Sequence, residues 1–317
     1  MATHLATERA GMVTLHLTVG APELYPDHVR FCEQPRVQFP GLTRRFPGAT
    51  HPTSRLSIAG SWRNHEHCNN HRSRPARTGT PRADCRCNRR QRGHGLETAR
   101  RARAEGARLI LTARNPERLE LAAGELEPLS TAAFDANDPA AIERFFGDLP
   151  RTIDHVMVTA GQPHYGRLLD MDLKQARRGL DTHLLQMLQV ARNAAHKVRP
   201  GGTLLFMGGT GGRRQGSGMG IVRTVTAALP ALTASLALEL APVRVNLIAA
   251  GFVDTPLSAS LLGDELDNRR NQLRATLPIR RVVLPADVAA LAVHIMTNTA
   301  LTGATYDIDG GQQLVAG

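Results

Sequence analysis

The chain has 317 residues, enough to bury a sizeable hydrophobic core, and a formal net charge of +11. Residues 1–92 contain 15 arginines, no lysine and 6 acidic residues, whereas the remainder is close to neutral, with 24 basic and 22 acidic residues. The sequence has no apolar run of about 18 residues and no secretory-signal pattern at its start, so we expect neither a membrane-spanning helix nor export.

The first segment, residues 1–92, reads as a basic extension rather than as a domain. Residues 12–19 alternate enough to form a strand and residues 56–59 could form a very short one, but the rest lacks sustained periodicity. An arginine-rich arm can bind phosphate backbones. Because no helix-turn-helix or zinc-finger pattern accompanies it, we do not expect nucleic acid as a partner.

Potential zinc ligands are scattered through the same extension. All four cysteines of the chain lie here, together with several histidines: Cys32, Cys68, Cys85, Cys87, His65, His67 and His71. Their spacing fits no closed zinc site, so we expect no metal. A second hypothesis is that this arginine-rich segment is read out of frame and replaces a native first strand. The body contains no cysteine, which is typical of a reducing, cytoplasmic compartment.

From residue 93 onwards, apolar strands alternate with amphipathic helices. We predict strands at residues 109–112, 130–134, 153–158, 203–207 and 243–249, with helices after Gly95, from Pro139, over 173–198, over 221–240 and over 287–296. Asp138 is placed to cap the helix that begins at Pro139. This alternation predicts an α/β fold, a Rossmann-like doubly wound parallel sheet with helices on both faces.

The segment LALELAPVRVNLIAAGFVDTP, residues 236–256, resembles the short-chain dehydrogenase/reductase family, and the resemblance extends over about residues 93–317. It divides the chain into the extension 1–92 and a Rossmann-type domain 93–317. It implies an oxidoreductase that acts on a carbonyl or an alcohol with NADP or NAD.

The family opens with a T-G-x-x-x-G-x-G turn that binds the cofactor pyrophosphate. Gly93 and Gly95 match its last two glycines, but Asn88 and Arg89 stand at the threonine and first-glycine positions, so part of the motif is degraded. Residues 81–87 would put charges into the central first strand, where unpaired burial is costly. We therefore expect the first-strand position of the sheet to be poorly packed, or to be occupied by another segment such as residues 12–19.

Further cofactor-binding positions follow from the same resemblance. Arg114, just past the second predicted strand, suits the 2′-phosphate of NADP, although NAD stays possible. The others are Asp135 and Ala136 beside the adenine, Ala160 and Gly161 in a Thr-Ala-Gly version of the family's Asn-Ala-Gly, and Gly251 and Thr255 in the turn over the nicotinamide.

The family's catalytic positions are altered. Its tyrosine and lysine correspond to Val222 and Thr226, and its serine to Gly209, next to Thr210. Valine cannot transfer a proton, so general acid catalysis worth about 10²–10⁴-fold is lost at that position. Thr210, His183 and Tyr165 are the candidate replacements. His183 falls where the family often has an asparagine, and a purely structural, half-buried histidine is the alternative.

Three functions compete at this stage. The first is an oxidoreductase with an atypical or impaired active site and a small-molecule substrate, whose lid would lie in residues 257–280. The second is a catalytically degenerate nucleotide-binding protein that acts as a sensor or assembly partner. The third is a basic-armed nucleic-acid binder. The resemblance also implies a cytoplasmic homo-oligomer, either a dimer or a tetramer.

Overall fold

The structure, a computed structural model, describes residues 12–17, 93–149, 152–161, 163–213 and 218–315. These described residues belong to one compact unit. The hypotheses about zinc ligands, nucleic acid and the reading frame concern residues that lie outside the description.

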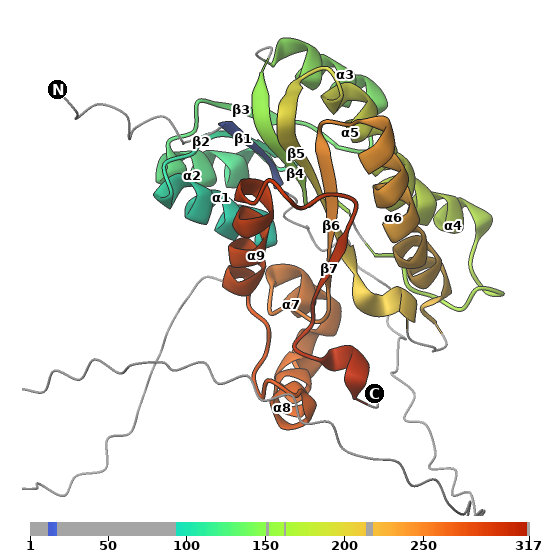
Figure 1. Ribbon diagram of the computed structural model, residues 1–317. Helices are drawn as coiled ribbons and strands as arrows, with labels where there is room; N and C mark the ends of the chain where they lie inside the picture. Colours follow the sequence, from blue (N-terminus) through green and yellow to red (C-terminus); the bar gives the residue numbers. More distant parts are fainter. Residues whose placement is uncertain (1–11, 18–92, 150–151, 162, 214–217, 316–317) are drawn as a thin grey trace, which may run out of the picture. The chain divides into compact units, whose positions relative to one another are not determined.

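Seven parallel strands form one sheet in the described part of the chain, in the order β3-β2-β1-β4-β5-β6-β7 (Figure 1). Their bounds are β1 Met12–Leu17, β2 Arg108–Ala113, β3 Ser130–Ala133, β4 Ile153–Val158, β5 Val198–Gly209, β6 Arg244–Ala250 and β7 Thr305–Ile308. The strand order reverses between β1 and β4, where open α/β sheets bind ligands beyond the carboxyl ends of their strands. The predicted doubly wound sheet is confirmed.

The central strand comes from the N-terminal extension. β1 pairs with β2 from Met12 opposite Arg108 onwards, and with β4 from Val13 opposite His155. The domain was expected over residues 93–317, and the sheet adds one strand from residues 1–92. That strand, residues 12–17, lies within the segment that the sequence analysis named for the first-strand position. A parallel sheet needs an apolar strand between β2 and β4, and MVTLHL fits better than PRADCRC.

Helices cover both faces of the sheet, each over its own hydrophobic cluster (Figure 1). On one face lie α1 His94–Ala104, α2 Pro116–Leu126 and α9 Pro285–Thr297; on the other lie α3 Pro139–Asp148, α5 Gln186–Ala194 and α6 Gly220–Glu239. The strands contribute alternate side chains to the two clusters, as Leu111 and Ile110 of β2 illustrate. Asp138 caps α3 as predicted, since its carboxylate accepts a hydrogen bond from the Ala140 N–H at 2.9 Å.

One long helix was predicted over residues 173–198, and the structure interrupts it. α4 Leu173–Leu180 leads into the π-helical turn η1 Asp181–Leu185 and then into α5, and β5 already begins at Val198. A π turn inserts one residue into the helix and changes the direction of the side chains that follow, and such turns occur frequently at functional sites. His183 lies in the middle of this turn.

The C-terminal part carries a small helical subassembly. α7 Pro256–Leu262, the short turn η3 Gly263–Glu265 and α8 Leu266–Thr276 follow β6, and they correspond to the expected lid segment. Leu273, Leu277 and Val282 form a separate cluster against Phe252. The remaining short turns are η2 Thr210–Arg213 after β5 and η4 Gln312–Leu314 after β7.

In the described residues, one helix, α6, is long and apolar enough to cross a membrane by length and composition alone. This is weak evidence for a membrane span, because core helices of soluble proteins pass the same test. Val225, Leu229 and Leu236 of α6 are buried in the protein core, and α6 tolerates Pro230 in its interior.

Candidate functional site

The N-terminus of α1 presents the two matched glycines. Gly93 precedes the helix in an extended conformation, and Gly95 in its first turn is buried. Backbone N–H groups in this turn have no partner within the helix and can bind an anion. The single carboxylate of the turn, Glu97, is paired with Arg100 at 2.6 Å, which lowers its repulsion of an anion.

His94, between the two glycines, is a feature that the sequence analysis did not single out. Its Nδ1 is buried without a hydrogen-bond partner in the described part of the chain. Burial lowers the pKa of its imidazole to about 4, so the ring is neutral at pH 7. An unsatisfied polar atom at the pyrophosphate-binding turn fits a bound polar group there.

Arg114 lies at the carboxyl end of β2 and is exposed. The next residue, Asn115, caps α2, since its side chain accepts a hydrogen bond from the Arg118 N–H at 2.8 Å. Arg114 therefore lies just before the N-cap of α2 and Arg118 in the first turn, at a helix N-terminus whose partial positive charge favours anions.

The loop after β3 brings Asp135 and Ala136 to the same edge of the sheet. Asp135 Oδ1 accepts hydrogen bonds from the backbone N–H and the side-chain Nδ2 of Asn137, both at 3.0 Å. Ala136 is buried. The Asp135 carboxylate is thus fixed by its own turn and keeps its second oxygen for another donor.

His183 packs against Gly161 at the carboxyl end of β4. A Cβ added to Gly161 would lie 3.0 Å from His183 Nε2, and Gly161 also has a φ of +148°. Glycine is required here for both reasons. Ala160 beside it is buried, so the Thr159-Ala160-Gly161 loop and η1 form one packed wall.

The hydrogen bonds of His183 define its tautomer. Thr182 Oγ1 donates to the Arg178 carbonyl at 2.8 Å and lies 3.3 Å from His183 Nδ1. With the Thr182 hydroxyl hydrogen directed to the Arg178 carbonyl, this contact fits the tautomer that has a hydrogen on Nδ1 and a lone pair on Nε2. Burial and then repulsion from His164 lower the pKa of His183 to about 4, so the ring is neutral at pH 7 and its bare nitrogen accepts hydrogen bonds.

Thr210 is buried at the start of η2, directly after β5. The glycine-rich loop that follows is held by close packing, since a Cβ on Gly212 would lie only 2.7 Å from the backbone N of Ala227 in α6. Arg213 closes the turn with an ion pair to Asp307 in β7 and donates to Gln313 Oε1 at 3.2 Å. These contacts supply the support that a loop so rich in glycine otherwise lacks.

The residues that the resemblance assigns to the catalytic positions lie on neighbouring elements. Thr226 Cγ2 lies 3.5 Å from the position of a Cβ on Gly209, so the serine and lysine positions are neighbours. The Thr226 hydroxyl donates to the Arg223 carbonyl at 3.1 Å, within α6. Val222, on the same helix, is half-buried and apolar.

Gly251 and Thr255 flank the loop after β6. Gly251 N–H donates to the Ile308 carbonyl at 3.1 Å, and Phe252 N–H donates to Gln312 Oε1 at 2.8 Å. Thr255 is buried as the cap of α7, where its Oγ1 accepts a hydrogen bond from Ser258 N–H at 3.2 Å. The loop is therefore tied to the chain's C-terminal turn on one side and to α7 on the other.

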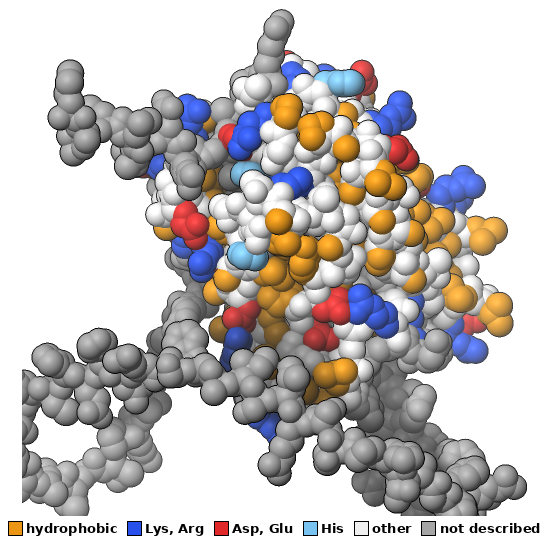
Figure 2. All heavy atoms as spheres, in the orientation of Figure 1, with side chains coloured by type: hydrophobic (Ala, Val, Ile, Leu, Met, Phe, Trp, Pro, Cys, Tyr) orange, Lys and Arg blue, Asp and Glu red, His pale blue; other side chains and the backbone are white. Residues whose placement is uncertain are grey.

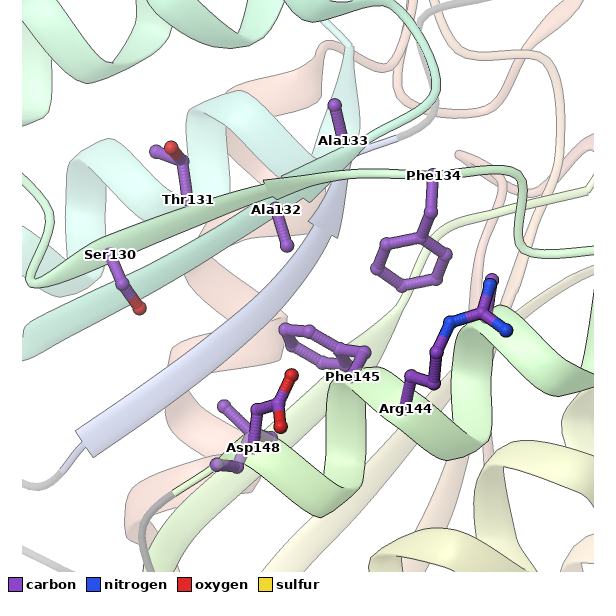
Figure 3. A pocket seen from close by; sticks show the side chains of 10 residues that line it. Ser130, Thr131, Ala132, Ala133, Phe134, Arg144, Phe145 and Asp148 are labelled. Carbon is purple, nitrogen blue, oxygen red and sulfur yellow. The ribbon is translucent and has the colours of Figure 1, made fainter.

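A pocket of about 420 Å³ lies elsewhere, between the edge strand β3 and α3 (Figure 3). Its lining includes Ala132, Phe134, Arg144, Phe145 and Asp148, and the two phenylalanine rings are 5.2 Å apart at their centroids. None of the predicted site residues lines it, and it is separate from the wall formed by His183 and Gly161.

The sequence analysis did not predict contacts between residues that are far apart in the sequence. Arg213 and Asp307 are 94 positions apart, and Arg270 in α8 pairs with Asp254 in the loop after β6. No spacing rule connects such residues, because the sheet and not a shared helix brings them together.

Comparison with known proteins agrees with this geometry. A sequence model of the family described as enoyl-(acyl carrier protein) reductase matches residues 89–313. The chain is 25% identical over 239 residues to the short-chain dehydrogenase/reductase ATR9 of Stachybotrys chlorohalonatus, covering 69% of this chain and 92% of that protein. It is 27% identical over 231 residues to an NADH-dependent enoyl-[acyl-carrier-protein] reductase of Rickettsia bellii, covering 68% and 87%.

The fold also resembles a solved structure, a small-chain dehydrogenase in complex with NADPH. The TM-score is 0.61 at 26% sequence identity, over 70% of this chain and 94% of that one. The matched segment, the doubly wound sheet and the order of the family's loops at its carboxyl edge lead to one conclusion: the chain belongs to the short-chain dehydrogenase/reductase family of oxidoreductases.

Proposed function

We propose that this chain binds NADP(H) along the carboxyl edge of its sheet and catalyses an oxidoreduction between a small-molecule alcohol and its carbonyl compound. Family members use NAD or NADP. The observation that carries the proposal is that Gly93, Arg114, Asp135, Gly161 and Gly251 lie at helix starts or strand ends along one edge of the sheet.

Preference for NADP rests on Arg114 and Arg118 at the start of α2. A 2′-phosphate would gain from both guanidinium groups and from the helix N-terminus. We expect NADPH to bind at least about tenfold more tightly than NADH, measured by titration calorimetry on the full chain. Arg114→Asp should reverse that preference, whereas Arg108→Gln, at the opposite end of β2, should not change it. If Arg114→Asp and Arg108→Gln bind NADPH with the same affinity, the result would contradict an NADP site at the start of α2.

His183 and Thr210 are proposed as the groups that serve the reacting oxygen, in place of the tyrosine and serine of the family. The nicotinamide, when bound, supplies or accepts the hydride. The Nε2 lone pair of His183 can take the proton that an alcohol loses on oxidation, and Thr210 can donate a hydrogen bond to the oxygen. Because burial lowers the pKa of His183 to about 4, the ring is neutral at pH 7 and offers a hydrogen-bond acceptor, not an acid, to the reacting group.

Turnover assays test this assignment. NADP reduction with a panel of alcohols should fall about 10²-fold or more in His183→Phe and about tenfold in Thr210→Val. Tyr165→Phe tests the third candidate donor: a loss of turnover as large as in His183→Phe would assign the role to Tyr165 instead. Tight NADPH binding without turnover on alcohols or carbonyl compounds would favour the sensor or assembly role, which Val222 and Thr226 at the catalytic positions would then explain.

We also infer a homo-oligomer, formed through the outer face of α5 and α6. Exposed residues on α6 recur at helical spacing and are mostly small, namely Thr224, Ala227, Ala231, Ala234, Ser235 and Leu238. Leu238 is 83% exposed, Leu185 at the end of η1 is 51% exposed, and Leu188 in α5 is 37% exposed. Figure 2 shows apolar side chains gathered on this side of the molecule.

Such a face suits a second copy of the chain, because small residues let helices approach closely and leucines supply buried area. Leu238→Glu should turn a dimer or tetramer into a monomer in analytical ultracentrifugation. Leu121→Glu, at an equally exposed leucine of α2, should leave the mass unchanged. A monomeric wild-type protein would refute the interface. A cytoplasmic location is part of the same proposal, and cell fractionation can check it.

A further inference from the structure

The α7–η3–α8 subassembly meets the loop after β6 through an ion pair. Asp254 belongs to that loop, next to Thr255, and Arg270 lies in the first half of α8. The guanidinium donates from Nε to Asp254 Oδ2 at 3.0 Å and from Nη2 to Asp254 Oδ1 at 2.7 Å. Both side chains are only 18% exposed, so water screens this bidentate pair less than it screens an ordinary surface pair.

The Asp254 side of the contact is rigid. Asp254 N–H donates to the Val283 carbonyl at 3.0 Å, and Val253 forms a β-bridge with Val283. Val253, Thr255 and Val283 are all buried. This loop contains Gly251 and Thr255, which are proposed to cover the nicotinamide, so its position matters for the cofactor.

The Arg270 side is attached more loosely. Within α8 only Leu273 is buried, and its small cluster is separate from the two clusters that cover the sheet. Gly263, at the joint between α7 and α8, has a φ of +48° and no atom within 4 Å of the position of a Cβ. A joint of this kind can change its backbone angles without disturbing packed neighbours.

We propose that the Asp254–Arg270 ion pair is a latch that holds α8 against the cofactor loop, and that opening of this latch sets how fast the cofactor enters and leaves. The inference deepens the proposed function, because it assigns regulation of access to the same site. Arg270 acts here as a positioning residue, since it reaches the site only through Asp254.

Hydrogen–deuterium exchange on the full chain without ligand tests the latch directly. Arg270→Gln should make the backbone amides of α7 and α8 exchange about 10- to 100-fold faster, and those of β4, β5 and β6 should not change. Arg274→Gln is the matched control, because its guanidinium bonds only within α8, to Asn271 at 2.8 Å. Unchanged exchange in Arg270→Gln, or an equal increase in Arg274→Gln, would overturn the latch.

A charge exchange covers the case in which Arg270→Gln unfolds. Arg270 also pairs with Asp267 within α8 at 2.8 Å, so the exchange variant Asp254→Arg/Arg270→Asp carries Asp267→Asn as well. It restores opposite charges between loop and helix, although it cannot reproduce the bidentate geometry in full. Recovery of most of the protection in α7 and α8 supports the latch. Protection no better than in Arg270→Gln means that the pair does not hold the helix.

Cofactor kinetics test the second half of the proposal. In stopped-flow fluorescence with NADPH, Arg270→Gln should raise the association and dissociation rates together, by about tenfold, with a smaller change in Kd. Unchanged rates in a variant whose α8 exchanges faster would overturn control of access. Absence of NADPH binding to the wild type would instead refute the cofactor site, and the exchange experiment would still decide whether the latch exists.

Discussion

Replacement of Arg244 should be among the most damaging single changes in the core. This arginine in β6 is only 5% exposed, and it donates to carbonyl oxygens without a carboxylate partner. Nη1 bonds Ile295, Asn298 and Leu301 at 2.9, 3.1 and 3.0 Å, Nη2 bonds Met296 at 2.7 Å, and Nε bonds Gly201 at 3.2 Å. The positive charge thus closes the C-terminal end of α9, where the helix dipole is negative.

The loss of stability on replacing Arg244 follows from the carbonyl acceptors that remain in the folded protein. Arg244→Met keeps most of the side-chain volume but removes a donor from five carbonyls, of which Leu301 O and Asn298 O keep a second donor, Asn246 Nδ2 at 2.9 Å and Leu301 N–H at 3.3 Å. Hydrogen bonds to a charged group contribute about 1.5–3 kcal/mol each, but they are not additive and water can reach some of the carbonyls. Since burial already lowers the pKa of the Arg244 guanidinium, part of the gain is offset by desolvation. We expect a net loss of about 3–5 kcal/mol in the free energy of unfolding, a large part of the about 5–15 kcal/mol typical of a domain.

Urea denaturation and thermal unfolding of the full chain measure this loss. The melting temperature should fall by about 6–20 °C, since about 1 kcal/mol corresponds to 2–4 °C in a domain of this size. Arg199→Gln is the matched control, because Arg199 pairs with Asp154 at the same sheet but is 47% exposed, and should cost less than about 1 kcal/mol. An Arg244→Met protein within about 1 kcal/mol of wild type would refute the capping role.

Three further predictions concern pH, catalysis and loop positioning. Burial lowers the pKa of three histidines to about 4, namely His94, His155 and His183. Below pH 6.5, the ordinary pKa of histidine, the unfolded chain therefore binds more protons than the folded chain. Stability should therefore fall as the pH drops from 6.5 towards 4 and level off below it, by about 3 kcal/mol per histidine. Urea midpoints across this range check it, and a flat profile would contradict neutral burial. Restoring the family's pair with Val222→Tyr/Thr226→Lys should raise carbonyl reduction about 10²-fold or more; no gain would mean that the missing pair is not what limits the site. Arg213→Ala should lower kcat about tenfold through the Thr210 turn while the melting temperature moves by less than about 4 °C, because the ion pair is half exposed. A lower melting temperature with an unchanged kcat would mean that Arg213 stabilises the fold and does not position Thr210.

Much of the fold was readable because its elements are local. The strand predicted over residues 109–112 is β2 Arg108–Ala113, and the helix predicted over 221–240 is α6 Gly220–Glu239. Each consists of contiguous residues whose apolar spacing matches a strand or one face of a helix. The interruption at η1 was not predicted, because the single residue that a π turn inserts shifts the apolar spacing by only one position.

The candidate site was readable only in part. Family motifs gave the positions of Gly93, Arg114 and Gly161, and the altered residues Val222 and Thr226 were visible at once. The tautomer of His183 was not, because it depends on which hydrogen the Thr182 hydroxyl has already donated to the Arg178 carbonyl. Hydrogen-bond direction is a property of assembled neighbours.

By itself the sequence identified the family and the alternation of strands and helices, and it predicts Val222 and Thr226 at the positions of the usual catalytic tyrosine and lysine. The tertiary structure decided that residues 12–17 fill the central strand, that Arg213 meets Asp307, and that Arg270 meets Asp254. Apolar periodicity is a property of residues close together in the chain, so it can be recognised in the sequence alone. Pairing between distant strands and distant charges depends on which surfaces the folded sheet brings together, and on the burial that makes a given pair worth forming.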